Sequence, residues 1–116
     1  MRASYRFKRQ GCRVIGDVAV TVSFAADDFP AVSWKSEALR ASFGEAAKAV
    51  EKGVLKALDG AQFRVLVEDV VEHEEDSSHY AFSVAAEAAV NRLRGRDELV
   101  PSEFPWPKNT MEFVRR

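Results

Sequence analysis

The stretch HEEDSSHYAFSVAAEAAV, residues 73–90, runs from a polar loop into an alanine-rich segment. Beyond the loop, apolar residues recur every three or four positions, at Phe82, Ala85, Ala86, Ala89, Val90 and Leu93. This spacing predicts a helix that ends near Gly95 and packs closely through its alanines. Asp76, Ser77 and Ser78 stand where the helix would begin, and such side chains can accept hydrogen bonds from its first free N–H groups. We therefore predict that these three residues form the helix cap.

Upstream of this stretch, the spacing of the apolar residues changes with position. Alternation with period two, typical of half-buried strands, occurs at residues 3–9, 17–24, 32–34 and 63–71. Residues 36–58 instead place apolar side chains on one helical face, which predicts a single helix of about six turns. Ser36 is its expected N-cap. Gly44 and Gly53 lower helical propensity within it, so we expect a close packing contact at each.

The predicted order of elements is β-β-β-α-β-α. This order fits an α+β two-layer sandwich, with an antiparallel meander of strands and two helices on one face. We assign residues 1–98 to this domain and residues 99–116 to a Pro-rich C-terminal tail, because the three prolines of the tail exclude an ordinary helix. Phe104 and Trp106 in the tail are expected to cover apolar surface of their own domain. Otherwise they would form a patch for another protein or a second copy of the chain.

The composition is that of an ordinary globular domain. With 116 residues, of which 47% are hydrophobic and 30% charged, the chain can bury one core. A net charge of −1 gives no general attraction to nucleic acid or membranes, so such binding would need a local patch. The apolar runs are too short to span a bilayer, no signal region follows the basic start, and a single cysteine suits a reducing compartment. We expect a cytoplasmic protein with no membrane partner.

Three segments of the sequence form a recognisable set: YRFKRQG (residues 5–11), AVEKGVLKAL (49–58) and HEEDSSHYAFSVAAEAAV (73–90). In their order and spacing they resemble domain IV of translation elongation factor G, over about residues 5–94. The resemblance implies the ribosomal protein S5 domain 2-like fold, which has the β-β-β-α-β-α order predicted above. In that family the domain is a lever whose tip loops enter the ribosomal decoding site. The resemblance places the tip in the loop between the first two strands and in the loop that carries His73.

The sequence also departs from this family. It contains no G-x-x-x-x-G-K-[ST] phosphate loop, so the nucleotide-driven motor is missing and we expect no nucleotide partner. The glycine-rich segment of the first tip loop is reduced to GCRVIGD, and the tail has no counterpart. A lever without its motor cannot perform translocation, and a fold does not carry function with it. We therefore predict that the chain is not an enzyme.

Catalysis and metal binding find little support in the residues themselves. Ser78 and His79 are neighbours, but a nucleophile also needs a base in the right place and a third group that orients the base. His73 and His79 lie six positions apart, and no cysteine pair or third histidine completes a zinc set with them. We predict no catalytic residue, no metal and no cofactor.

Basic residues gather near the N-terminus. Five of them, and no acids, lie within the first 13 residues: Arg2, Arg6, Lys8, Arg9 and Arg13. A basic strand and loop can bind phosphates with salt-dependent affinity, which makes the last four of these RNA-binding candidates. His73 joins them through the resemblance. Alternatively, the basic strand is neutralised within the fold: we expect the fourth strand to lie beside the first, so that six acids between residues 68 and 76 form cross-strand pairs with it.

The sequence therefore predicts a non-enzymatic binding module whose leading partner is the ribosome or structured RNA. The alternative is a protein–protein interaction or dimerisation module that kept the fold without RNA binding. RNA binding should weaken steeply with salt, whereas the alternative should show an exposed apolar patch around Trp106.

Overall fold

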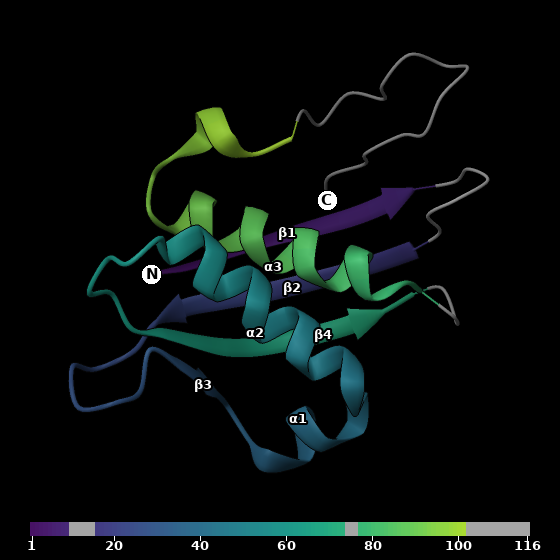
Figure 1. The fold of residues 1–116 in the computed structure, drawn as a ribbon, viewed down its shortest axis with the longest axis horizontal. Helices are drawn as coiled ribbons and strands as arrows, with labels where there is room; N and C mark the ends of the chain where they lie inside the picture. Colours follow the sequence, from purple (N-terminus) through teal and green to yellow (C-terminus); the bar gives the residue numbers. More distant parts are fainter. Residues whose placement is uncertain (10–15, 74–76, 102–116) are drawn as a thin grey trace.

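Four strands form one mixed sheet in the computed structural model, which describes residues 1–9, 16–73 and 77–101 (Figure 1). The strands are β1 (Arg2–Arg9), β2 (Gly16–Phe24), β3 (Val32–Trp34) and β4 (Val65–Glu72). The helices are α1 (Glu37–Phe43), α2 (Glu45–Leu58) and α3 (His79–Leu93), followed by a short 3-10 helix, η1 (Asp97–Leu99). The predicted α+β class is confirmed. None of the helices in the described residues is long and apolar enough to cross a bilayer.

The strand order is β1-β2-β4-β3, with β3 parallel to β4 and the other two pairings antiparallel. The predicted antiparallel meander is therefore wrong. The chain leaves β3, passes through α1 and α2 over one face of the sheet, and returns as β4. Such a crossover brings its two strands together in parallel. Because β4 lies beside β2, the predicted pairing of the first strand with the fourth is also wrong.

The core lies between the sheet and the helix pair α2–α3, which covers one face of the sheet (Figure 1). Alternate residues of β1 and β2 point into it and are fully buried: Tyr5, Phe7, Val18, Val20 and Val22. The apolar stripe predicted for α3 is buried against them, as is the stripe of α2 that contains Val50 and Val54. Period two in the strands and period 3.6 in the helices therefore identified the faces that meet.

Helices α2 and α3 approach each other most closely at Gly53, where the backbone of α3 lies against the position of the missing side chain. A Cβ at Gly53 would overlap the carbonyl oxygen of Ser83 in α3 and would lie 3.1 Å from the Cβ of Ala86. Only a glycine allows α2 and α3 this close an approach. The close packing contact predicted for Gly53 is confirmed.

Gly44 has a different explanation. It ends α1 and precedes α2 with φ 55° and ψ −124°, and nothing lies within 4 Å of the position of its missing Cβ. The packing contact predicted for Gly44 is therefore wrong, and so is the single helix predicted over residues 36–58. The positive φ, which favours glycine, turns the chain between two helices. Ser36 is the N-cap of α1, and its side chain accepts a hydrogen bond from the Leu39 N–H, as predicted.

The short edge strand β3 is fastened to the helices through one carboxylate. Glu51 of α2 accepts hydrogen bonds from the Trp34 indole nitrogen at 2.7 Å and from Nε of Arg40 at 2.8 Å. These hydrogen bonds, first among them the one from Arg40, lower the pKa of the Glu51 carboxyl, although burial opposes them. Glu51 thus connects β3, α1 and α2.

Candidate nucleic-acid interface

Three strand ends meet at one end of the sheet. In the register of the sheet, Arg9 pairs with Gly16, and Val18 pairs with Glu72. The end of β1, the start of β2 and the end of β4 are therefore neighbours (Figure 1). This is the end of the molecule where the resemblance placed the two tip loops.

Asp17 holds the side chain of Arg6 at this end. The Arg6 guanidinium donates from Nε to Oδ1 and from Nη2 to Oδ2, each at 2.6 Å. The Arg6 side chain is 19% exposed and that of Asp17 is 9% exposed. A bidentate arginine–carboxylate ion pair of this geometry is among the stronger charge-assisted contacts in proteins. Arg6 is therefore fixed along the outer face of the sheet.

The charges around Asp17 shift its titration. Burial by itself would raise the pKa of the Asp17 carboxyl, but the hydrogen bond and the charge of Arg6 outweigh burial and hold the pKa below its ordinary value. The charges of His73 and Lys8 act in the same direction. The hydrogen bond to Asp17 also raises the pKa of the Arg6 guanidinium. Asp17 is thus an anion that faces Arg6 and Lys8 of β1 and lies close to His73, the residue after β4.

The backbone of Asp17 fixes both sides of the loop between β4 and α3. Its carbonyl oxygen accepts from the His73 N–H at 2.7 Å, and its N–H donates to Oγ of Ser77 at 3.0 Å. The Ser77 N–H in turn donates to Oε2 of Glu72 at 3.1 Å. Next to it, a Cβ on Gly16 would overlap the Cβ of Ala81, so a glycine at this position lets the start of α3 approach β2.

The predicted helix cap divides into separate roles. Ser78 is the N-cap of α3, and its Oγ accepts from the Ala81 N–H at 3.2 Å. The Oγ of Ser77, the residue before this N-cap, faces β2 and accepts a hydrogen bond from the Asp17 N–H. Asp76 lies outside the described residues.

Replacement of Ser78 tests this assignment. We expect Ser78→Ala to lower the free energy of unfolding by about 1 kcal/mol, because the Ala81 N–H loses its side-chain acceptor and keeps only the Ser78 carbonyl oxygen. Ser78→Gly should lower the free energy of unfolding by only a few tenths of a kcal/mol, because glycine is tolerated at an N-cap. Urea unfolding of the two variants measures the difference. Equal losses for alanine and glycine would contradict the capping role.

The structure places the RNA-binding candidates unequally. Lys8 is half-buried on the outer face of β1, directly opposite Asp17 in the register, and His73 is exposed at the end of β4. Arg6 is in the same cluster, in its ion pair with Asp17. The backbone of Arg9 ends β1, and Arg13 lies outside the described residues. The tail is described only as far as Pro101, so the patch predicted at Phe104 and Trp106 also lies outside.

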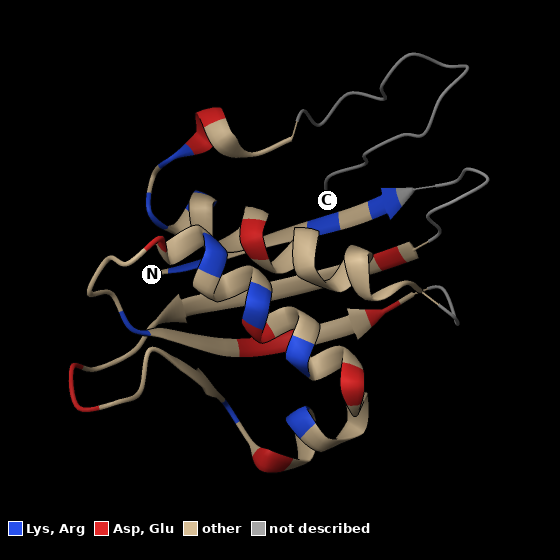
Figure 2. Cartoon of the chain, viewed as in Figure 1, with Lys and Arg blue, Asp and Glu red and all other residues tan. Residues whose placement is uncertain are grey.

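The acidic residues of β4 do not neutralise β1 in the way that the sequence predicted, because β2 lies between the two strands. Glu68 lies 3.8 Å from Nη2 of Arg2 and 3.8 Å from Nζ of Lys35, across β2 and at the other end of β1. Figure 2 shows Lys and Arg along β1, with Asp or Glu at the adjoining ends of β2 and β4. Asp17, the acid that does meet the basic cluster, is on the second strand. Sequence reasoning missed it, although an acid opening an otherwise apolar strand was the available signal.

Among the described residues, no three His, Cys, Asp or Glu side chains are grouped so that they could hold a metal ion. No protein-family model matches the sequence, and no curated protein matches it. The contacts around Asp17 are therefore the main basis for a functional proposal.

Proposed function

We propose that this domain is a non-enzymatic binding module that contacts structured RNA, with ribosomal RNA as the leading target. The observation that carries the proposal is the cluster of Arg6, Lys8 and His73 around the Asp17 carboxylate, at the end of the sheet where β1 and β4 end and β2 begins. Glu72, the other acid at this end, accepts a hydrogen bond from the Ser77 N–H. Among the described residues Lys8 forms no ion pair, so its ammonium group is open to a phosphate. Phosphates attract such clusters, and the affinity falls as salt rises. A ribosomal target implies a cytoplasmic location.

We also propose that the fold is of the ribosomal protein S5 domain 2-like type, as in domain IV of elongation factor G. Support comes from the matched segments of the sequence. AVEKGVLKAL forms the second part of α2, the alanine-rich run forms α3, and these two helices pack on each other. Further support comes from the loop after β4, whose His73 and Ser77 are both bound to the start of β2. The proposal makes this end of the sheet the RNA-facing tip.

Reversal of one charge in the cluster tests the RNA proposal. We expect Lys8→Glu to weaken the binding of ribosomes or of a structured RNA hairpin several-fold, because a phosphate contact is replaced by repulsion. Arg9→Glu combined with Arg13→Glu should weaken it further. The measurements are co-sedimentation with ribosomes at low and moderate salt, and fluorescence anisotropy with the hairpin.

Lys52→Glu is the matched control. It makes the same change of charge at an exposed site on α2, on the helix side of the molecule. It should leave the affinity close to that of the unchanged chain. Removal of Lys8 should also reduce the slope of log affinity against log salt by about one. Binding that ignores both salt and Lys8→Glu would refute the proposal and favour the protein-interaction alternative.

A further inference from the structure

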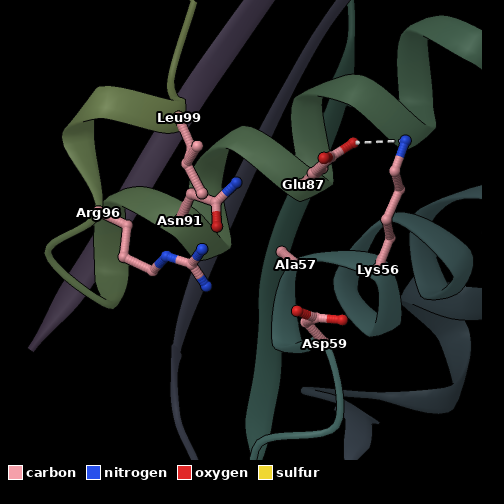
Figure 3. A pocket seen from close by; sticks show the side chains of 7 residues that line it. All are labelled: Lys56, Ala57, Asp59, Glu87, Asn91, Arg96 and Leu99. Carbon is pink, nitrogen blue, oxygen red and sulfur yellow. Dashed lines mark ion pairs between the residues drawn. The ribbon is translucent and has the colours of Figure 1, made fainter.

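A pocket opens between the C-terminal end of α2, the second half of α3 and η1 (Figure 3). Its volume is about 280 Å³. It lies beyond the start of β4, whereas the Asp17 cluster lies at the end of that strand, so the whole length of β4 separates the two sites (Figure 1). Pockets that hold small molecules begin at roughly this volume. The occupant would therefore be small.

Asn91 supplies a buried polar group to this pocket. Its side chain lines the pocket, the residue is 3% exposed, and its Oδ1 accepts no hydrogen bond from any described residue. Buried acceptors in folded proteins are nearly always paired, and an exception needs an explanation. A donor from a bound molecule would satisfy this oxygen. The backbone carbonyl of Asn91 is occupied separately, by the Arg96 N–H at 2.8 Å.

Two charged side chains reach into the same space from opposite sides. Figure 3 shows the guanidinium of Arg96, from the segment before η1, and the carboxylate of Asp59, from the end of α2, both directed into the space beside Asn91. Neither forms an ion pair within the part of the chain that the structure describes. Lys56 and Glu87 at the rim, in contrast, pair with each other at 3.7 Å. The pocket thus offers one cation, one anion and one neutral acceptor that are unpaired.

We propose that this pocket binds a small zwitterion of the size of a free α-amino acid. The carboxylate of the ligand meets Arg96, since a guanidinium and a carboxylate match in charge and geometry. Its ammonium group lies between the Asp59 carboxylate and Oδ1 of Asn91, and it supplies the donor that Asn91 lacks. An anion alone would leave Asp59 and Asn91 without a partner, and a cation alone would leave Arg96 without one. This site is independent of the proposed RNA function.

Titration of the full chain with free amino acids tests the proposal. Amide chemical shifts in ¹H–¹⁵N spectra should move in a saturable way at Asp59, Asn91 and Arg96 for at least one amino acid, with a dissociation constant of about 1 mM or lower. Acetate and methylammonium serve as probes with a single charge, and each should bind at least tenfold more weakly. The proposal would be overturned if none of the amino acids produced a saturable shift, or if acetate alone bound as tightly as the amino acid.

Two variants locate the site without disturbing the core. Arg96→Gln should weaken the ligand at least tenfold, and so should Asp59→Asn, which suits the left-handed backbone at this residue (φ 48°). Lys52→Gln, outside the pocket, should change nothing. Unchanged affinity in both pocket variants would also overturn the proposal. Asn91→Leu adds an independent readout, because it should abolish binding while raising the melting temperature of the ligand-free chain by removing a buried unpaired acceptor.

Discussion

Gly53→Ala is expected to lower the free energy of unfolding by about 1–3 kcal/mol, the range seen when an extra methyl group is forced into a packed interior. The new Cβ would overlap the carbonyl oxygen of Ser83, and this atom belongs to the backbone of α3. A helix backbone cannot rotate aside as the end of a long side chain can. The variant must therefore separate α2 from α3 or displace the turn of α3 at Ser83.

The sign of the change in stability distinguishes a packing contact at Gly53 from an effect of helix propensity alone. In an exposed helix interior, replacing glycine with alanine stabilises a protein by about 1 kcal/mol. Lys52 is the neighbouring residue and is exposed, so Lys52→Gly and Lys52→Ala give the propensity difference within the same helix. Urea unfolding of all three variants, with the slope m compared across them, measures the effect. A gain in stability for Gly53→Ala, of the size measured at Lys52, would show that the helices are not in contact there.

The same glycine marks what the sequence could and could not predict. Apolar periodicity located every strand within about two residues, and it identified the buried stripes of α2 and α3, because burial acts on alternate or every third and fourth positions. It failed at Gly44, since apolar residues continue in helical spacing through Phe43 and Ala46. The turn between α1 and α2 depends on the φ angle of one residue, which leaves no trace in hydrophobic spacing.

Strand partners were a second limit. Alternation assigns a face to each strand, but it does not say which strand lies alongside. The parallel place of β3 depends on its pairing with the distant residues Val65–Val67 of β4, which the crossover through α1 and α2 makes possible. The candidate interface shows the same division. The basic residues of β1 could be read from the sequence, whereas their meeting with Asp17 required the register of β1 and β2.

Asp17→Asn is expected to lower the free energy of unfolding by about 2–3 kcal/mol near neutral pH. This is less than the loss seen when one partner of a fully buried ion pair is removed, because the Arg6 side chain keeps 19% exposure. The backbone contacts to His73 and Ser77 do not depend on the side chain, so the variant isolates the carboxylate. Asp27→Asn is the control, since Asp27 is exposed and forms no ion pair with the described residues.

The pH dependence of that difference follows from the lowered pKa of Asp17. In the unfolded chain the carboxyl titrates near its ordinary value of 3.8, and in the folded protein it titrates below it. A depressed pKa in the folded state gives stability that is fully present above the unfolded pKa and is lost as pH falls through the folded pKa. The gap in stability between the unchanged chain and Asp17→Asn should therefore stay constant from about pH 7 to about pH 5 and shrink below about pH 4. Urea unfolding at each pH, with Asp27→Asn in parallel, measures it. A gap that persists undiminished into strong acid would mean that the charge of Asp17 does not hold Arg6, and the cationic cluster would then need another organising anion.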